Sequence, residues 1–576
     1  MGVPGFFLWL LKKYKKNNFI FDKSTLKDQK LLSQVNNLDY ILIDANCLIH
    51  PVCFQVIKDN PNLNNIDKLQ KKMYNEVILY IEKIISFVNP KIGVYLAVDG
   101  VAPIAKMKQQ RSRRFKSVYD NNLWNNIKKK HNKEIPMFWN NSCISPGTKF
   151  MDDLHNKLKI WGEQYSSDHN LKVIYSSCNS PAEGEHKLLQ FIRDNLKNKI
   201  DYTYITYGLD ADLIFLMLAT GIKDTFLLRE ANNLNKKNKS DELQFVSMNI
   251  MRESIIKSVK RLIDLDESIV INEDNLINDF IFICYLLGND FLPHIPSLDI
   301  YNNGIDYLLK IYVDILENND FNYLINKNSD EKINQEFFNK FIYKISLDEE
   351  AILKKNYASK KRRFKCQSTD LYDIEMHKIE NLQFRIEDPV QLGKDSMEEW
   401  RNRYYKHYYE LEPEEIDDFS KEMVKHFLNG LKWVTEYYFD KCPAWRWYYP
   451  YDIPPFITDI HNFKINFKEF NFKLEEPLSQ FEQLLCVLPP QSSYLLPLSL
   501  RKIMLNNNSS VRYLYPTSFE LDFLNKKKYW MTIPKLPDLD ITSIQKIFKK
   551  YSYKITDFDK KLNSKQKVYI YLKKSD

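Results

Sequence analysis

Seven acidic residues fall into five short motifs of this 576-residue sequence: LIDANCLIH, LAVDGVAP, SPAEGEHK, GLDADLI and LLGNDFLPH. They are Asp44, Asp99, Glu183, Glu185, Asp210, Asp212 and Asp290. Carboxylates gathered at one point repel one another or take up protons unless cations neutralise them. Hard oxygen ligands of this kind suit Mg²⁺ or Mn²⁺ rather than zinc. Two such ions, roughly 3.5–4 Å apart, can activate a water and stabilise the leaving oxygen in phosphodiester hydrolysis.

Several of these acids come directly after predicted β-strands. Short apolar runs bounded by polar or turn residues predict strands at residues 40–43, 93–98, 172–175 and 202–206. Asp44 and Asp99 follow the first two runs at once, and Asp210 follows the fourth after a Gly-Leu step. Open α/β sheets bind ligands at the carboxyl edge of their strands, so these three carboxylates should meet there. The Glu-Gly-Glu and Asp-Ala-Asp pairs can each present two carboxylates to the same point.

Each acid taken alone also has an ordinary structural interpretation. Residues 180–183, Ser-Pro-Ala-Glu, read as a capping box with Ser at the N-cap, Pro at N1 and Glu at N3. Asp44 and Asp99 could be strand-end turn residues, and Asp290 could lie in the turn that ends a helix. An acid in that place opposes the helix dipole, so Asp290 would need a compensating cation. The coincidence of all seven favours a metal site.

A basic helix is predicted a few residues after Asp99, in the run AKMKQQRSRRF. Its residues at spacing i, i+4, i+7 and i+8 share one face, and they are Lys106, Gln110, Arg113 and Arg114. Two guanidinium forks, an ammonium and an amide suit a terminal phosphate, which carries more charge than an internal diester. Lys108, Arg111 and Lys116 lie on other faces, where we expect an ordinary solvated charged surface.

The composition is that of a globular chain with a mild excess of positive charge. Hydrophobic residues make up 44% of the sequence and aromatic residues 14%, which is more than disordered chains carry. The 83 Lys and Arg residues exceed the 75 Asp and Glu residues, which suits a polyanionic partner without identifying it. The eight cysteines form no C-x-x-C pair, so we interpret them as reduced intracellular thiols. Apolar runs are too short for a membrane span or a signal peptide.

Three regions can be distinguished along the chain. Residues 1–311 alternate short apolar runs with helical patterns, which is typical of an α/β domain. Residues 312–395 are rich in Asn, Lys and Asp, and we interpret them as a variable connector with some helix. Residues 396–576 are predicted to be mainly helical and rich in aromatic residues. The connector holds a basic cluster that is either a nuclear localisation signal or, more plainly, a solvated or RNA-facing charge run: Lys360, Lys361, Arg362, Arg363 and Lys365.

As a set, the motifs resemble the Xrn family of 5′→3′ exoribonucleases. The matching segments are MGVPGFFLWL, IDANCLIH, DGVAPIAKMKQQRSRRF, ISPGTKFM, AEGEHK, GLDADLI, GNDFLPHIPSLDI, LNGLKWVTEYYFDKCPAWRWYYPY and FEQLLCVLPPQSSYLLP, in the order found in the family. One departure is Ala182, where glycine is commoner in the family. The resemblance implies an α/β fold with a PIN-like 5′-nuclease core. In that core a mixed, mostly parallel sheet is flanked by helices, and a mainly helical second segment packs against it.

The resemblance also implies roles for individual residues. The seven acids would be the metal ligands, and the four residues on the basic face would form a pocket for a 5′ monophosphate. His50 matches the family position whose ring stacks on a terminal base, together with a tryptophan that is Trp445 or Trp447 here. Stacking tolerates any base and contributes roughly 1–3 kcal/mol per base. Gly2 and Pro4 belong to the family's N-terminal segment, which shapes the channel.

We therefore expect a 5′→3′ exoribonuclease that degrades 5′-monophosphorylated single-stranded RNA to nucleoside 5′-monophosphates, in RNA decay or processing. Its cofactors would be two Mg²⁺ ions, which Mn²⁺ can replace. One alternative is a structure-specific flap nuclease on DNA, although the sequence lacks a Gly-rich hairpin motif. The other is a non-catalytic RNA-binding scaffold, which would not need seven acids. We expect a compact, monomeric, intracellular member, cytoplasmic rather than nuclear, without the long C-terminal domains of large members and without membrane contact.

Overall fold

A computed structural model of the chain describes residue 3 and residues 5–63, 65–231, 242–263, 271–319, 321–359, 366–383 and 388–572. The basic cluster at residues 360–365 lies outside the described residues, as do Gly2 and Pro4. Eight strands form one sheet in the order β1-β7-β6-β5-β2-β3-β4-β10. Their bounds are β1 (Ile20–Phe21), β2 (Tyr40–Asp44), β3 (Gly93–Ala97), β4 (Lys172–Ser176), β5 (Tyr204–Tyr207), β6 (Phe226–Glu230), β7 (Leu243–Ser247) and β10 (Tyr569–Tyr571).

The middle of this sheet is parallel and both of its edges are antiparallel. β6, β5, β2, β3 and β4 run parallel to one another. β7 and β1 extend one edge in antiparallel fashion, and β10 pairs antiparallel with β4 at the other edge. The four strands predicted from the sequence are all present, with ends shifted by at most two residues. The predicted mixed, mostly parallel sheet is confirmed.

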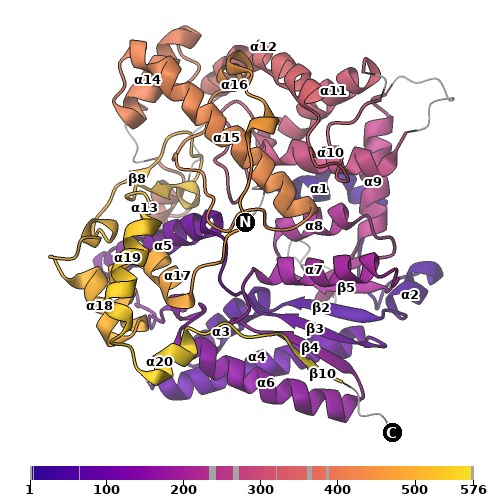
Figure 1. The fold of residues 1–576 in the computed structure, drawn as a ribbon, viewed down its shortest axis with the longest axis vertical. Helices are drawn as coiled ribbons and strands as arrows, with labels where there is room; N and C mark the ends of the chain where they lie inside the picture. Colours follow the sequence, from indigo (N-terminus) through magenta and orange to yellow (C-terminus); the bar gives the residue numbers. More distant parts are fainter. Residues whose placement is uncertain are drawn as a thin grey trace.

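Helices cover both faces of the sheet, which is why the central strands are mainly apolar. One face packs against α3 (Asn46–Asp59), α4 (Ile66–Val88) and α6 (Lys149–His169). The other face packs against α1 (Phe6–Tyr14), α7 (Gly184–Lys197), α8 (Ala211–Thr220) and α9 (Met248–Lys260). Figure 1 shows the two layers, with α4 and α6 below the strands and α7 and α8 above them. α2 (Gln29–Val35) precedes β2, and Gln34 on it donates to Asp224, just before β6, at 2.8 Å.

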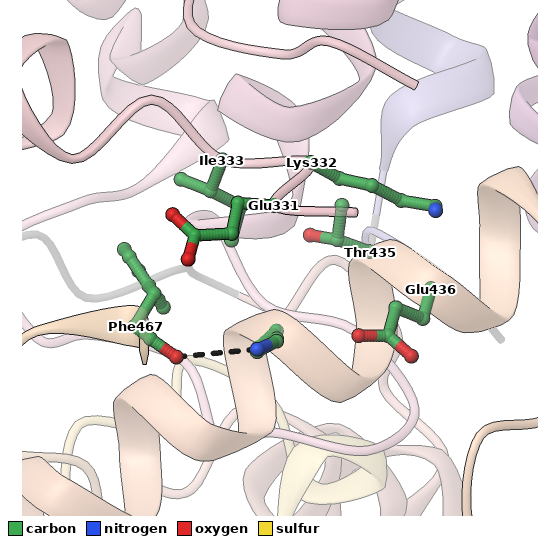
Figure 2. A pocket seen from close by; sticks show the side chains of 7 residues that line it. Glu331, Lys332, Ile333, Thr435, Glu436 and Phe467 are labelled. Carbon is green, nitrogen blue, oxygen red and sulfur yellow. Dashed lines mark hydrogen bonds between the residues drawn. The ribbon is translucent and has the colours of Figure 1, made fainter. Parts of the chain in front are cut away.

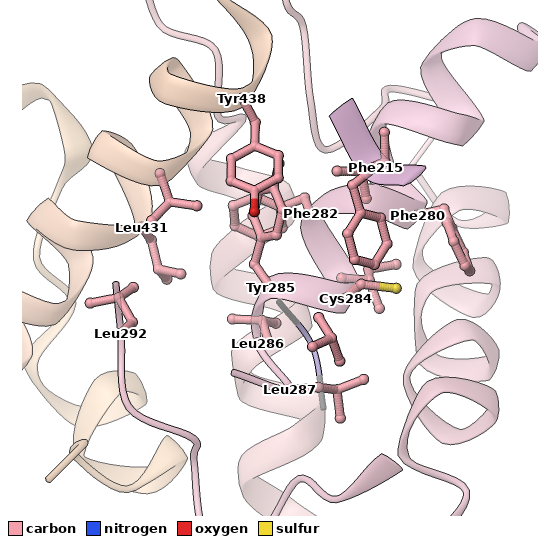
Figure 3. Packing of buried hydrophobic residues seen from close by; sticks show 14 of the residues in the cluster. Phe215, Phe280, Phe282, Cys284, Tyr285, Leu286, Leu287, Leu292, Leu431 and Tyr438 are labelled. Atoms are coloured by element: carbon pink, nitrogen blue, oxygen red, sulfur yellow. The ribbon is translucent and has the colours of Figure 1, made fainter. Parts of the chain in front are cut away.

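A large helical segment continues the core on the α8 side of the sheet. Its helices are α10 (Glu273–Tyr285), α11 (Gly304–Glu317), α12 (Gln335–Ser359), α14 (Met397–Tyr409), α15 (Ile416–Phe439) and α16 (Ile457–Phe463). Phe215 of α8, the apolar residues of α10, and Leu431 and Tyr438 of α15 face one another in this core (Figure 3). The rings of Tyr285 and Tyr438 lie 4.7 Å apart. The first part of the second segment therefore shares one apolar core with the eight-stranded sheet.

The segment interpreted as a connector takes part in that core. Phe337, Phe341 and Ile345 of α12 are fully buried within it. Just before α12, residues 331–333 border a small cavity against α15 (Figure 2). In it, Lys432 donates to the backbone carbonyls of Phe467 and Phe470 at 3.2 and 2.8 Å. Although Asn and Lys are frequent in this stretch, α12 has a regular apolar face.

The remaining helices gather around the long basic helix α5 (Ile104–Lys130). α17 (Gln480–Val487), α18 (Leu498–Leu505) and α19 (Ile541–Ser552) share a separate apolar core with the start of α5. α13 (Leu371–Glu380) meets the far end of α5, where Lys130 and His131 contact Glu375. α20 (Asp557–Leu562) leads to β10, while β8 (Leu521–Asp522) and β9 (Ile533–Pro534) form a small hairpin. Across the described helices, none is both long and apolar enough to cross a membrane.

Candidate functional site

The carboxyl edge of the parallel strands opens into a cavity of about 450 Å³. Ten of the residues singled out in the sequence line it: Asp44, Asp99, Glu183, Glu185, Asp210, Lys106, Gln110, Arg113, Arg114 and His50. Five of the seven acids and all four residues of the basic face therefore share one space. Asp212, Asp290, Trp445 and Trp447 do not line it.

Strand register explains why acids far apart in the chain meet. Asp44 is the last residue of β2 and pairs with Ala97, so Asp99 lies just beyond the neighbouring strand end. Asn46 links the two: its side-chain amide donates to Asp99 at 2.7 Å, and its backbone N–H donates to Asp44 at 3.3 Å. On the other side of β2, Ile43 pairs with Tyr207 of β5, which brings Asp210 to the same edge.

Gly184, the first residue of α7, allows that helix to approach these acids closely. Its backbone N–H donates to Asp99 Oδ1 at 2.6 Å. A Cβ at Gly184 would lie 2.7 Å from Asp44 Oδ1 and 3.3 Å from Asp99 Oδ1. Real Cβ atoms do not come within 3.0 Å of such oxygens. The glycine of the AEGEHK motif is therefore a steric requirement of the acidic site.

The capping-box interpretation of Glu183 is wrong. The helix begins at Gly184, so Glu183 occupies the N-cap position itself and its side chain makes no capping hydrogen bond. One of its oxygens lies 2.5 Å from the Lys106 ammonium, and the other accepts from the Tyr437 hydroxyl at 2.6 Å. Ala182 just before it has a φ of 93°, a conformation that turns the chain before the helix can start.

Asp212 and Asp290 do not line the cavity, but Lys106 interacts with both of them and with Glu183. Its ammonium, close to Glu183, is also 2.9 Å from Asp290 Oδ2. The predicted need of Asp290 for a compensating cation is thus confirmed, and Arg113 adds a second positive charge at 4.0 Å. Asp212 interacts electrostatically with Asp290, Lys106 and Asp210, and its Oδ1 is buried without a hydrogen-bond partner among the described residues.

The cluster carries more negative charge than its protein neighbours neutralise. Burial, then repulsion by Asp99 and Asp210, raises the pKa of Asp44 from 3.8 to about 8. Burial and Glu183 raise the pKa of Asp99 to about 6, while burial and Asp290 raise that of Asp212 to about 7. Burial also raises the pKa of Glu185 well above its ordinary value. A divalent cation would stabilise these buried carboxylates, because their oxygens repel one another and Asp212 Oδ1 has no hydrogen-bond partner among the described residues.

The basic face of α5 points into the cavity. The Arg113 side chain is 44% exposed, while Arg114 is more deeply placed and burial lowers its pKa to about 10. Arg114 Nη1 and Gln110 Oε1 are both buried and have no hydrogen-bond partner within the part of the chain that the structure describes. A group able to accept and donate hydrogen bonds in the cavity would satisfy them.

The other faces of α5 are not the solvated surface we expected. Arg111 is only 2% exposed and donates to the backbone carbonyls of Cys486 and Leu514. Lys108 donates to the carbonyl of Tyr449 at 3.1 Å, and the Lys116 ammonium lies 4.2 Å from the centre of the Tyr529 ring. These faces attach α5 to the second segment, which the spacing of charges alone could not reveal.

Of the predicted stacking residues, only His50 reaches the cavity. Burial, with Arg114 nearby, lowers the pKa of His50 to about 4, so its ring is neutral. Trp447 stacks on Trp433 with ring centres 5.0 Å apart, inside the helical core. Trp445 accepts a hydrogen bond through its carbonyl from Ile104, at the start of α5. Neither tryptophan lines the cavity, so the choice between Trp445 and Trp447 as the stacking partner of His50 stays a prediction.

Sequence reasoning missed several residues beside the acids. The hydroxyl of Tyr437 in α15 donates to Glu183, and the Cys47 thiol donates to Asp44 Oδ2 at 3.1 Å. His186 stacks on Tyr437 with ring centres 3.7 Å apart, and burial lowers its pKa well below the ordinary value. Gln483 of α17 lines the cavity and accepts from the backbone of Ala102. His186 and Cys47 lie inside the acidic motifs. Tyr437 and Gln483 lie in the motifs LNGLKWVTEYYFDKCPAWRWYYPY and FEQLLCVLPPQSSYLLP, but nothing in these motifs links either residue to the acids.

Comparison with known proteins agrees with this geometry. Residues 1–231 match the family described as XRN 5′-3′ exonuclease N-terminus, and residues 270–384 and 367–576 match the Xrn1 helical domain. The 5′-3′ exoribonuclease 2 of Candida albicans is 28% identical over 99% of this chain and 74% of its own length. The human 5′-3′ exoribonuclease 1 is 30% identical over 94% of this chain and 33% of its own length. The chain therefore belongs to the XRN family of 5′-3′ exonucleases.

Proposed function

We propose that this chain removes nucleotides one at a time from the 5′ end of single-stranded RNA that carries a 5′ monophosphate. Its relatives are 5′-3′ exoribonucleases, and hydrolysis of RNA from the 5′ end is the activity of this chain. The observation that supports the finer proposal is the shared cavity: acids at one edge of the sheet face the basic side of α5 within a single space.

Two divalent cations, Mg²⁺ with Mn²⁺ as a substitute, fit the acidic side of the cavity. The ligands would come from the seven acids, of which Asp44, Asp99, Glu183, Glu185 and Asp210 line the cavity. When bound, such ions lower the pKa of a water and stabilise the leaving oxygen of a phosphodiester. The chain itself holds Asp99 through Asn46 and Gly184, and Glu183 through Lys106 and Tyr437. These contacts fix the carboxylates before any ion binds.

The basic side of the cavity would hold the terminal phosphate. A 5′ monophosphate carries more charge and more free oxygens than a diester inside the chain, so it gains more from two guanidinium groups. Arg114 Nη1, which has no hydrogen-bond partner among the described residues, and the exposed guanidinium of Arg113 supply these donors. When the 5′ terminal phosphate is held at this place, the first phosphodiester lies beside the acids, so the enzyme cleaves from the 5′ end. His50 would stack on the first base regardless of its identity.

The test is the digestion of a 3′-labelled RNA that bears a 5′ monophosphate, hydroxyl, triphosphate or cap, with and without Mg²⁺. We expect mononucleotide products from the monophosphorylated RNA only when the ion is present. Asp210→Ala should abolish turnover and leave RNA binding intact, while Asp168→Ala, an exposed acid on α6, should behave as wild type. Normal turnover by a folded Asp210→Ala variant would rule out the metal mechanism.

Arg113→Ala tests the phosphate pocket. We expect it to erase the preference for a 5′ monophosphate over a 5′ hydroxyl, because the Arg113 guanidinium binds the extra charge of the phosphate. Lys128→Ala, on the far end of the same helix, should keep the preference. An unchanged preference in the Arg113 variant would remove the proposed role of this helix face.

A further inference from the structure

β10 is the last strand of the eight-stranded sheet, and only one of its two edges is paired. It pairs antiparallel with β4, and among the described residues no strand lies on its other side. Figure 1 shows β10 at the margin of the sheet, beyond β4. The outer edge of β10 therefore presents backbone groups to which another extended chain can add as a strand.

The residues of this strand alternate between a packed face and an exposed face. The rings of Tyr569 and Tyr571 pack on the apolar core that contains α6. Val568, Ile570 and Leu572 alternate with them, so they lie on the opposite face, where they are 39%, 57% and 67% exposed. Three exposed apolar side chains in a row would be covered by the side chains of an added strand, which gives the edge an affinity for apolar residues.

The surroundings of this edge are positively charged. Lys567 comes just before the strand and Lys561 lies in α20, and both side chains are exposed. Lys159 of α6 is also exposed, and its ammonium lies 5.2 Å from the centre of the Tyr569 ring. None of these three lysines forms an ion pair within the described part of the chain. Glu163 of α6 offsets part of the charge, but the balance favours an acidic partner.

A second copy of this chain suits the edge poorly. If two β10 strands paired antiparallel about Ile570, Lys567 of one copy would stand opposite Lys573 of the other, by their positions in the sequence. Like charges directly opposite each other destabilise a strand pair. The lysines therefore disfavour pairing between copies and leave the edge open to a chain of opposite charge.

We propose that the outer edge of β10 binds an extended segment of a partner protein, in which alternating apolar residues stand between Asp or Glu residues. Its backbone would add a ninth strand to the sheet, its apolar side chains would cover Val568, Ile570 and Leu572, and its acids would meet the lysines. No residue of β10 lines the catalytic cavity, so the inference does not rest on the proposed function.

The probe is the fluorescein-labelled peptide EEVTITVEE, titrated with the full chain and followed by fluorescence anisotropy. A strand this short buries much less than the roughly 1,200 Å² of a stable interface, so we expect a Kd on the order of 100 µM that weakens as salt is added. The peptide KKVTITVKK should bind at least about tenfold more weakly, because lysines surround the edge. EEVTITVEE with methylated backbone nitrogens should not bind, because it cannot donate hydrogen bonds to the strand.

Two variants test the contacts on the protein side. Ile570→Glu and Lys567→Glu should each weaken the binding of EEVTITVEE about tenfold, through lost apolar contact and reversed charge. The matched controls lie on α4: Leu79, 55% exposed, is replaced by Glu, and so is the exposed Lys71. Both control variants should bind the peptide as the wild type does. All four should keep wild-type turnover on monophosphorylated RNA, which verifies that they are folded.

Failure of the wild-type chain to bind EEVTITVEE at about 1 mM would overturn the proposal. Equal affinity for the acidic and basic peptides, binding of the methylated peptide, or wild-type affinity in Ile570→Glu would overturn it as well. Self-association of the chain that Ile570→Glu abolishes would assign the edge to a second copy and refute a separate partner. Peptide binding by a chain that does not hydrolyse RNA would contradict only the proposed function.

Discussion

The acids of this site are packed so closely that a single methyl group should disturb them. In Gly184→Ala the new Cβ would lie 2.7 Å from Asp44 Oδ1, so the carboxylate or the helix must move. We expect turnover to fall at least about tenfold, since misplacing reacting groups by a fraction of an ångström is costly. The free energy of unfolding should change by only about 1–3 kcal/mol, as is usual for local overpacking.

Steady-state hydrolysis and chemical denaturation of the Gly184 variant check this prediction together. The variant should remain folded at the assay temperature, and more Mg²⁺ should not restore its rate. Wild-type turnover by the alanine variant would show that the close approach of α7 to Asp44 and Asp99 is not needed for activity.

The raised pKa values of the acids predict how pH changes stability. In the folded, metal-free protein the pKa of Asp44 is about 8 and that of Asp212 about 7, both above their ordinary 3.8. The folded state then holds more protons than the unfolded chain, so these groups contribute stability at low pH and lose it as pH rises through their folded pKa values. In EDTA we expect the Tm to fall between about pH 5 and pH 8.

Divalent ions should reverse that trend. They displace protons from the acids, so the increase in Tm caused by Mg²⁺ should be larger at pH 8 than at pH 5. In Asp44→Asn the side chain at this position cannot titrate, so the Tm of the variant in EDTA should depend less on pH. The same Mg²⁺ effect at both pH values would mean that the ions do not bind at these acids.

At the scale of helices and strands, four of the five parallel strands were predicted because each is a short apolar run bounded by polar or turn residues, whereas β6 (Phe226–Glu230) was missed. β2, β3, β4 and β5 lie between helices on both faces, and burial on both sides leaves this pattern. The edge strands were not predictable in the same way. β1 has only two residues, and β10 depends on β4, which lies almost 400 positions earlier in the sequence.

The site residues that lie in short recognisable motifs could be predicted from the sequence. All seven acids and the basic face of α5 stand in recognisable local patterns. The capping box at residues 180–183 was a false local signal, because Ala182 turns the chain and the helix starts later. The contact between Tyr437 and Glu183 could not be predicted, since the two residues are 254 positions apart and meet only in the folded chain.

The contact between α15 and the acids gives a prediction for Tyr437→Phe. The variant loses only the hydroxyl that donates to Glu183 at 2.6 Å. We expect the Mg²⁺ concentration for half-maximal turnover to rise about tenfold, as is common when a residue that orients a metal ligand is removed. The stability loss should be about 1 kcal/mol.

Tyr515→Phe is the matched control for Tyr437→Phe. Tyr515 is also fully buried, and its hydroxyl donates to the carbonyl of Leu485 at 2.9 Å, in the separate core around α17. It should lose similar stability but keep the wild-type Mg²⁺ dependence. If both variants show the same Mg²⁺ dependence, Tyr437 has a structural role only.

For the molecule as a whole, β10 joins the far part of the chain to the nuclease sheet. Tyr569 and Tyr571 pair with Tyr175 and Val173 of β4, and the ring of Tyr569 packs near His155. The sheet is therefore built from residues on both sides of the helical segment. β4 would otherwise be an edge strand with unpaired backbone groups, which favours association with other chains.

Removal of residues 568–576 should expose that edge. We expect the free energy of unfolding to fall by about 2 kcal/mol from the loss of partly buried tyrosines, and the protein to associate as its concentration rises. Light scattering across a dilution series checks the association. Leu572→Ser, at a residue that is 67% exposed, should remain unaffected. If the truncated chain stays monodisperse, pairing of β10 with β4 is not needed to prevent association.

The position of β10 in the chain also determines the order in which the enzyme can be completed during synthesis. A ribosome makes β4 early and β10 only after the whole helical segment, so a nascent chain carries an open sheet edge for most of its translation. Tyr437, which holds Glu183, also emerges late. We therefore expect stalled nascent chains that end before α15 to be inactive towards RNA, and activity from such chains would contradict this order. The sheet and the contact to Glu183 are therefore completed only near the end of the chain's own synthesis.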